Sequence, residues 1–183
     1  TPTTGSITFD GQDLTGKNPA VIVNSGVIHV PEGRRVFPAL DVEENLQAAN
    51  YGRGSESLKE GLQAAYEAFP ILRERRHQAA GLLSGGQQQM LSLARAIVAK
   101  PKLLLIDEMS LGLAPVLVKE FYESLGTLFS DDVTLLLVEQ NASMALAHCK
   151  RFYVIRNGEI ALEGASDDYR DNHTALQSAY LGI

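Results

Sequence analysis

The sequence predicts an α/β fold with a ligand site at the carboxyl end of a buried strand. Leu103–Ile106 is a short apolar run after a proline, which suits a strand buried on both faces. Asp107 and Glu108 follow it directly, and open α/β sheets place ligands beyond such strand ends. A helical pattern that begins at Ser84 precedes the strand, as expected when helices alternate with strands.

The start of that helix has the features of an anion site. Ser84 is a favoured N-cap residue, and the helix N–H groups beyond it have no partner within the helix. Gly85 and Gly86 let a ligand approach the main chain closely. Such helix ends attract phosphate. Together with the acidic strand end, they predict nucleotide and magnesium chemistry.

Composition narrows the class of protein. A chain of 183 residues is long enough for one domain with a core. The net charge is −6 with no block of Lys and Arg, which argues against nucleic acid as a partner. A single cysteine, Cys149, excludes an internal disulfide. The apolar runs are too short to span a bilayer, so we expect any membrane connection to go through a partner.

The N-terminal segment imitates a phosphate loop. Ser6–Asp10 alternates like a half-exposed strand, and Gly11–Asn18 then fits GxxxxGK[ST] except at its last position. Asn18 lacks the hydroxyl that binds magnesium, and Asp13 adds a negative charge to the loop. We interpret the segment as a surface turn. No lysine in the chain is followed by Ser or Thr, so the phosphate-loop motif is absent from these residues.

The middle of the chain predicts a strand followed by helices. A helix is expected at Ala20–Ser25, a strand at Val27–Val30 and a loop at Pro31–Pro38. Asp41 resembles an N-cap, and the pattern stays helical to about Ala80, with Pro70 ending one helix. One face of that helix carries its apolar residues: Leu58, Leu62, Ala65 and Phe69. The charged stretch Arg73–His77 is expected to be solvated, and His77 to be no metal ligand.

The second half predicts further alternation. The helix that starts at Ser84 carries an expected core face of Met90, Ala94, Ile97 and Val98. A helix is expected at Val116–Phe129 and a strand at Val133–Val138, followed by Glu139–Asn141. Asn157–Gly158 is a strong hairpin signal between Phe152–Arg156 and Glu159–Glu163.

The ordered pair LSGGQ (83–87) and LLLIDE (103–108) resembles the signature and Walker B motifs of ABC-transporter ATPases. The resemblance runs from about Thr4 to Gly182. It implies a P-loop NTPase-like parallel sheet core with an inserted helical subdomain, truncated at the N-terminus. The single incomplete domain 1–183 would have its α/β core at 1–40 and 95–183, and the helical subdomain with the signature motif at 41–94.

Three blocks are similar to the ATPases of branched-chain amino acid importers: VPEGRRVF (30–37), SLGLAP (110–115) and VEQN (138–141). In this resemblance Glu32 stands where most of the family has a glutamine that reaches magnesium and the attacking water. Gln140 stands where most members have a histidine that senses the γ-phosphate. Met109 replaces the usual proline after the two acids.

The resemblance also implies the site. Two subunits would close head to tail over ATP and Mg²⁺. The phosphate contacts would come from the signature residues across the interface: Ser84, Gly85, Gly86 and Gln87. Asp107 would hold magnesium through water, and Glu108 would polarise the attacking water. The missing phosphate loop would lie upstream of Thr1, so we expect this chain alone to be inactive and poorly stable.

The implied partners are a second ABC ATPase subunit, membrane permease subunits and, indirectly, a solute-binding protein. The loop after Glu32 normally contacts the permease, which makes Arg34, Arg35 and Phe37 candidate contact residues. The chain would then lie in the cytoplasm, at the inner face of the plasma membrane.

Other functions remain open. Related ATPases of urea or amide importers share these blocks, because solute choice lies mainly in other subunits. A non-catalytic module that uses the signature surface to complete a partner's site also fits a chain without a phosphate loop. A DNA-repair ATPase of the same superfamily is disfavoured, because the sequence has no long coiled coil or basic stretch.

Overall fold

The computed structural model describes residues 4–33, 35–50, 54–109, 118, 122, 125 and 132–169. It divides the chain into two compact units, Thr1–Leu136 and Leu137–Ile183. The SLGLAP block and Arg34 lie outside the described residues. So does most of the helix expected at 116–129, of which Tyr122 and Leu125 are described as helical and buried.

The segment that imitates a phosphate loop is a small hairpin followed by a helix cap. β1 (Thr8–Phe9) pairs with the antiparallel β2 (Gln12–Asp13). The Asn18 side chain then accepts a hydrogen bond from the Ala20 N–H at 2.9 Å and caps α1 (Pro19–Asn24). Most of this segment is exposed, so the predicted surface turn is confirmed.

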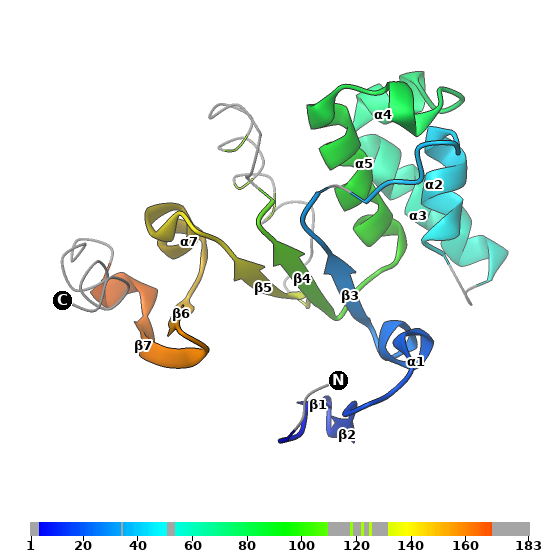
Figure 1. Ribbon diagram of the computed structural model, residues 1–183. Coiled ribbons are helices and arrows are strands. Elements are labelled where there is room, and N and C mark those ends of the chain that lie inside the picture. The colour runs from blue at the N-terminus through cyan, green and yellow to red at the C-terminus, as the bar shows by residue number, and fades with distance from the viewer. Residues whose placement is uncertain are drawn as a thin grey trace. The chain divides into compact units, whose positions relative to one another are not determined.

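A sheet of order β3-β4-β5 carries the acidic strand end (Figure 1). β3 (Val27–Val30) and β4 (Leu103–Asp107) run parallel, and β5 (Thr134–Val138) lies on the other side of β4. The expectation that β4 is buried on both faces is wrong for these residues. Leu104 and Ile106 are buried, whereas Leu103 and Leu105 are half-buried. The pleat turns successive side chains to opposite faces, and the two faces are covered unequally.

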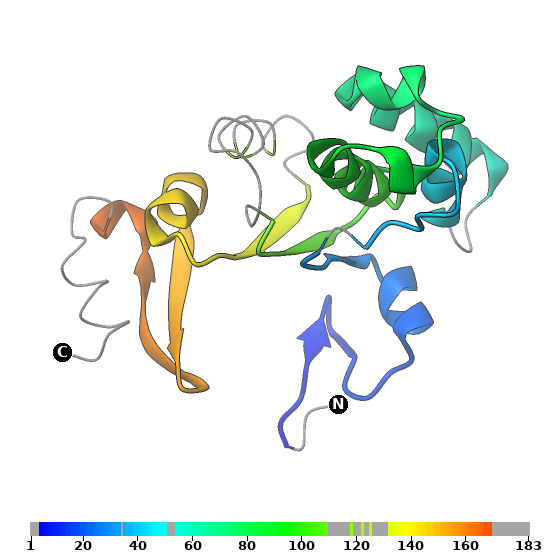
Figure 2. The same ribbon diagram turned by 45° about the horizontal axis from the view of Figure 1, so that its top comes forward.

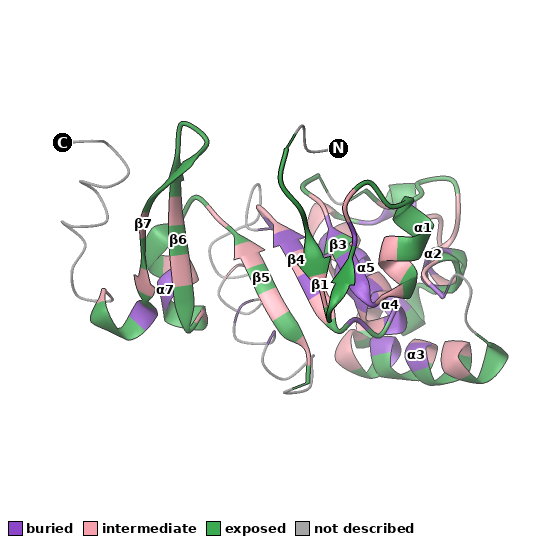
Figure 3. Cartoon of the chain, turned by 90° about the horizontal axis from the view of Figure 1, so that it is seen from below, coloured by how far each residue is buried: buried purple, intermediate pink, exposed green. Residues whose placement is uncertain are grey.

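Four α-helices pack around one apolar core, and Figure 3 shows buried residues on them. They are α2 (Val42–Ala48), α3 (Ser55–Ala68), α4 (Pro70–Glu74) and α5 (Gly85–Val98), and the 3₁₀ turn η1 (Ala80–Leu82) precedes α5. Pro70 begins α4 at its first position, where its missing N–H costs nothing. α3 and α5 approach closely, since a Cβ on Gly61 would lie 3.1 Å from the Val98 Cα.

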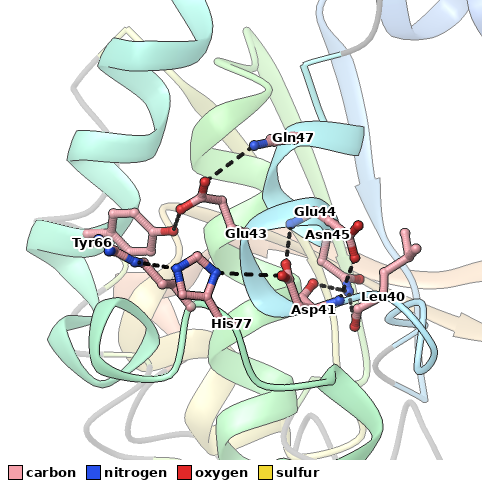
Figure 4. Close-up of polar contacts among 9 residues, drawn as sticks. Leu40, Asp41, Glu43, Glu44, Asn45, Gln47, Tyr66 and His77 are labelled. Carbon is pink, nitrogen blue, oxygen red and sulfur yellow. Dashed lines mark hydrogen bonds and ion pairs between the residues drawn. The ribbon is translucent and has the colours of Figure 1, made fainter.

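Asp41 caps α2 as predicted, and its neighbours form the polar network of Figure 4. Its carboxylate accepts from the Glu44 N–H at 2.7 Å, while the Glu44 carboxylate accepts from the Asp41 N–H at 2.8 Å. His77 joins this network: its Nδ1 lies 3.8 Å from the Asp41 carboxylate, and its Nε2 accepts from the Arg76 Nε–H at 3.0 Å. The described residues contain no group of three or more His, Cys, Asp or Glu that could hold a metal ion.

Two buried polar groups stabilise the same region. The fully buried Asn45 accepts from the Phe37 N–H at 2.8 Å and donates to the carbonyls of Phe37, Leu40 and Asp41. The Tyr66 hydroxyl donates to the Glu43 carboxylate at 3.1 Å. Burial, reinforced by that carboxylate, raises the pKa of Tyr66. These contacts join α2 to α3 and to the loop before α2.

The second unit contains α7 (Ala142–His148), the hairpin of β6 (Arg151–Arg156) and β7 (Glu159–Ala165), and the 3₁₀ turn η2 (Ser166–Asp168) (Figure 2). Asn157 and Gly158 form the predicted turn, with φ of 52° and 83°. Phe152 and Tyr169 meet edge to face with ring centroids 5.0 Å apart. Across the described part of the chain, no helix has the length and apolarity needed to cross a membrane.

Candidate functional site

Two loops that carry acidic residues leave the sheet at the same edge. We call residues 31–38, of which Arg34 is not described, the first acid loop. Residues 107–109, which include the last residue of β4, are the second acid loop. Val30 pairs with Ile106 in the parallel register of β3 and β4. The residues that follow are therefore Pro31–Glu32 on one strand and Asp107–Glu108 on the other. The structure thus brings Glu32, Asp107 and Glu108 to one edge, with Glu32 exposed and the other two partly buried.

Each acid loop contains a non-glycine residue in the left-handed region. Arg35 in the first acid loop has φ of 43°, and Glu108 in the second has φ of 42°. This conformation brings Cβ close to the carbonyl oxygen and costs about 1–2 kcal/mol for an ordinary residue. Such a cost is sustained only where neighbouring contacts hold the backbone. α5 supplies one such contact to each loop.

The N-terminus of α5 is closed by a capping box. The Ser84 Oγ accepts from the Gln87 N–H at 3.3 Å, and the Gln87 Oε1 accepts from the Ser84 N–H at 3.0 Å. Both side chains use an oxygen as acceptor, which leaves the Ser84 hydroxyl hydrogen and the Gln87 amide group to donate. The N–H groups of Gly85 and Gly86 lie in the same first turn. The helix start therefore gathers several donors that suit one anion.

The Ser-x-x-Gln spacing is the sequence signal for this box, and it identifies Gln87 as a structural partner of Ser84 as well as a ligand candidate. The sequence-based prediction named only Ser84 as the cap and did not include the hydrogen bond from the Ser84 N–H to the Gln87 side chain. Because the box fixes both side chains before any ligand arrives, the donors are preorganised.

Two residues of α5 that the sequence analysis did not single out reach the acid loops. Gln89 is buried, and its Nε2 donates to the Met109 carbonyl at 2.9 Å. Arg95 donates through Nη1 to the Arg35 carbonyl at 2.9 Å, and its guanidinium lies 4.8 Å from the Phe37 ring centroid. Burial lowers the pKa of Arg95. The sequence signal for these contacts is that Gln89 and Arg95 are polar residues beside the apolar positions of α5. It does not identify their partners, because those partners are distant in sequence.

Not all predicted residues share one unit. Ser84, Gly85, Gly86 and Gln87 lie on α5 or its cap, and Glu32, Asp107 and Glu108 lie in the acid loops, all within Thr1–Leu136. Gln140 belongs to the second unit, where it is exposed in the connection between β5 and α7. Asn141 follows it and caps α7, accepting from the Met144 N–H at 3.1 Å.

The residues present fit part of a magnesium–nucleotide site. Helix N-termini with unpaired N–H groups bind phosphate, and Mg²⁺ is held by one or two carboxylates with waters and substrate phosphates. The α5 start supplies the first feature, and Glu32 and Asp107 supply the second. No group of three or more His, Cys, Asp or Glu in the described ranges forms a metal cage. The 183 residues contain no GxxxxGK[ST] motif, so the β-phosphate cradle is absent from this sequence.

Comparison with known sequences agrees with these features. Residues 1–110 match the profile of the ABC transporter family. The chain is 43% identical to the high-affinity branched-chain amino acid transport ATP-binding protein BraG of Pseudomonas aeruginosa, over 97% of this chain and 76% of that protein. It is 34% identical to the probable branched-chain amino acid transport ATP-binding protein LivF of Archaeoglobus fulgidus, over 98% of this chain and 76% of that protein.

Solved structures share the fold. An ATP-binding subunit of an ABC transporter superposes with a TM-score of 0.78 at 25% identity, covering 99% of this chain and 75% of the other. The ADP conformation of an ATP-binding cassette of an ABC transporter gives 0.76 at 23% identity, covering 99% and 78%. The α/β architecture expected from the sequence is thereby confirmed.

Proposed function

The chain belongs to the ABC transporter family of ATP-hydrolysing subunits, and on that premise we propose that it serves an importer of branched-chain amino acids. The names of its similar relatives support this solute class. The blocks VPEGRRVF and VEQN support it further, since they resemble the ATPases of those importers. An ATPase of a urea or amide importer remains the alternative within this class.

The observation that carries the proposal is the preorganised donor set at the start of α5. In our proposal the Ser84 hydroxyl, the N–H groups of Gly85 and Gly86 and the Gln87 amide bind the γ-phosphate of ATP held by a second ATPase subunit. Their hydrogen bonds stabilise the negative charge that spreads over the phosphoryl oxygens during transfer. The capping box keeps the donors in place without a ligand, so little reorganisation is needed.

The acid loops and Gln140 are proposed to supply the contacts with magnesium, with the attacking water and with the γ-phosphate. Asp107 is proposed to hold Mg²⁺ through water, and Mg²⁺ when bound neutralises phosphate charge. Glu108 orients and polarises the attacking water. Glu32 would help to hold Mg²⁺ and would contact the same water. Gln140 can donate a hydrogen bond to the γ-phosphate but cannot carry a proton or a positive charge.

We further propose that the 183-residue chain does not hydrolyse ATP by itself. Phosphoryl transfer depends on a phosphate cradle, and the sequence contains no phosphate-loop motif. Hydrolysis then requires a partner that provides a phosphate loop.

We also propose a division of the domain in which 41–94 is the helical subdomain and 1–40 and 95–183 form the α/β core.

The proposed assembly places the subunit at the cytoplasmic face of the plasma membrane through permease subunits. The first acid loop offers the contact, because Arg35 and Phe37 are exposed on it. Arg34 is a further candidate. A solute-binding protein would act on the subunit only indirectly, through the permease.

A composite-site assay tests the phosphate role. The chain is mixed with an ATPase subunit of a branched-chain amino acid importer that keeps its phosphate loop but has the signature serine changed to alanine. We expect ATP hydrolysis above that of the altered subunit alone. Ser84→Ala should remove the gain, on the order of a hundredfold for one lost transition-state donor. Asp41→Ala, which removes a capping box on α2, is the matched control. No gain with the wild-type chain would contradict the proposal.

The absence of GxxxxGK[ST] from the sequence favours one second candidate, a non-catalytic module that completes a partner's site. The intact mass of the natural protein, with ATP binding measured on the same sample, separates the two. A mass larger than this chain with Mg²⁺-dependent ATP binding supports the ATPase subunit. A mass equal to these 183 residues without ATP binding supports the module.

A further inference from the structure

Two polar side chains of α5 hold the backbone of the two acid loops. Arg95 donates to the carbonyl of Arg35 in the first acid loop, and Gln89 donates to the carbonyl of Met109 in the second. The contacts span 60 and 20 residues of sequence, so they join parts of the chain that local structure would leave independent. α5 is therefore a common support for both loops.

Each contact falls at the point where its loop is strained. Arg35, whose carbonyl accepts from Arg95, has φ of 43°. Glu108, which directly precedes the carbonyl held by Gln89, has φ of 42°. A left-handed non-glycine residue needs surrounding contacts to persist. The two donors from α5 are such contacts. Arg95 holds the carbonyl of Arg35, three residues after Glu32, and Gln89 holds the carbonyl of Met109, the residue after Glu108.

The contacts of the Arg95 guanidinium are with the first acid loop. The described residues offer its guanidinium no carboxylate partner, and its buried Nε has no hydrogen bond. Its recognised contacts are the Arg35 carbonyl and the Phe37 ring, both in the first acid loop. A partly buried arginine normally needs compensation for lost hydration. Here that compensation comes from the loop that it holds.

We propose that Arg95 and Gln89 are positioning residues, which fix Glu32 and Glu108 relative to the phosphate-binding start of α5. The inference rests on the proposed function, because it takes the α5 start as the phosphate contact. A shift of α5 on binding phosphate would then move both acid loops together. Neither residue touches the reacting atoms.

Amide hydrogen exchange measured without ligand tests whether the hydrogen bonds from Arg95 and Gln89 hold the backbone of the acid loops. The chain is compared with Arg95→Met, which keeps length without a donor, with Arg95→Lys, which restores a donor, and with Gln89→Met. We expect exchange at the Arg35 and Phe37 amides to rise about tenfold in Arg95→Met, the loss of one hydrogen bond, and to recover partly in Arg95→Lys. Gln89→Met should do the same at Met109. If Arg95→Met fails to fold, Phe37→Leu removes only the ring and should raise exchange roughly threefold.

Arg73 provides the matched control. Its guanidinium lies 5.6 Å from the Tyr66 ring centroid, so it is also an arginine over an aromatic ring, but it contacts neither acid loop. Arg73→Met should leave exchange in both loops unchanged. Equal exchange in Arg95→Met and wild type would overturn the inference, as would a rise in Arg73→Met of the same size.

An ATP titration of the ¹⁵N-labelled chain mixed with the unlabelled second ATPase subunit of the composite-site assay, followed by amide chemical shifts, tests the coupling. In the wild type we expect the amides of Gly85 and Gly86 and those of Arg35 and Met109 to shift with one midpoint. In Arg95→Met the chemical shift of the Arg35 amide should no longer change with ATP concentration. The shifts of Gly85 and Gly86 should keep their midpoint within about twofold, since the substitution does not alter the helix start.

The outcomes separate the inference from the proposed function. If Gly85 and Gly86 shift in the wild type but the loops do not, the coupling is overturned and the phosphate contact stands. If Gly85 and Gly86 do not shift, the phosphate contact is overturned, and the exchange comparison alone decides whether Arg95 and Gln89 hold the loops.

Discussion

Val30 of β3 and Ile106 of β4 are paired in parallel register, so both strands deliver their next residues to one edge of the sheet. Glu32 follows the first strand, and Glu108 follows the second. Two side chains of α5, Arg95 and Gln89, donate hydrogen bonds to the loops after these strands. The N-terminus of the same helix provides hydrogen-bond donors for an anion. Acid groups and anion donors are thus linked through one helix rather than through the sheet alone.

Removal of the α5 cap should lower both stability and phosphate binding. Ser84→Ala deletes one half of a capping box, and the loss of such a cap costs about 1 kcal/mol. Urea unfolding followed by circular dichroism measures the change in free energy. In the mixture with the second ATPase subunit, the same variant should lose the ATP-induced amide shifts at Gly86.

Asp41→Ala tests whether that loss is specific. It removes the capping box of α2 and should cost a similar free energy of unfolding, also about 1 kcal/mol. It should leave the ATP response at Gly86 unchanged, because α2 lies outside the proposed site. If both variants lose the response equally, the Ser84 effect is one of stability only.

Glu108→Gln should not alter ATP turnover by the isolated 183-residue chain. The substitution keeps the shape of the side chain and removes its charge, and in a complete site it would remove the group that polarises water. Since the sequence has no phosphate-loop motif, both forms should show the same background rate of phosphate release. A wild-type rate that falls on Glu108→Gln would refute the proposal that the chain alone is inactive.

Asn45→Ala should destabilise the first unit strongly. The substitution leaves the Phe37 N–H and three carbonyls without their side-chain partner in a fully buried position. The three carbonyls each keep a backbone N–H donor, whereas the Phe37 N–H loses its acceptor. One unsatisfied buried donor costs about 1–3 kcal/mol, so we expect a loss of that size in the free energy of unfolding. Thermal and urea unfolding measure it.

Gln47→Ala is the corresponding surface substitution on the same helix. Its amide donates to Glu43 at 3.4 Å in an exposed position, so the change should stay within about 0.5 kcal/mol. An Asn45→Ala protein as stable as Gln47→Ala would show that the buried amide is replaced by water.

Local sequence signals predicted much of the fold. Val27–Val30 was located with its correct bounds, because an apolar run lies between Gly26 and Pro31. Asn157–Gly158 formed the expected hairpin turn, since both residues tolerate positive φ. Asp41 capped α2 as expected. These features depend on residues within a few positions of one another.

Features that depend on distant contacts could not be predicted in the same way. Leu103 and Leu105 are only half-buried, because the covering of each face of the sheet is set by other elements. Arg95 and Gln89 were overlooked, since their partners Arg35 and Met109 are distant in sequence. The roles of Glu32 and Glu108 came from a family resemblance, and only the strand register places them at one edge. Their roles remain predictions.

Tyr66→Phe should remove part of the loss of stability at high pH. Tyr66 is 8% exposed and donates to Glu43, and burial with this contact raises its pKa in the folded protein. A raised folded pKa means that the contribution to stability is complete below the unfolded value of about 10 and is lost as the pH rises above it. The free energy of unfolding should therefore fall more steeply above pH ~10 in the wild type than in Tyr66→Phe. Urea unfolding at several pH values measures both slopes. Equal slopes in wild type and Tyr66→Phe would show that neither burial nor the Glu43 contact shifts the ionisation of Tyr66.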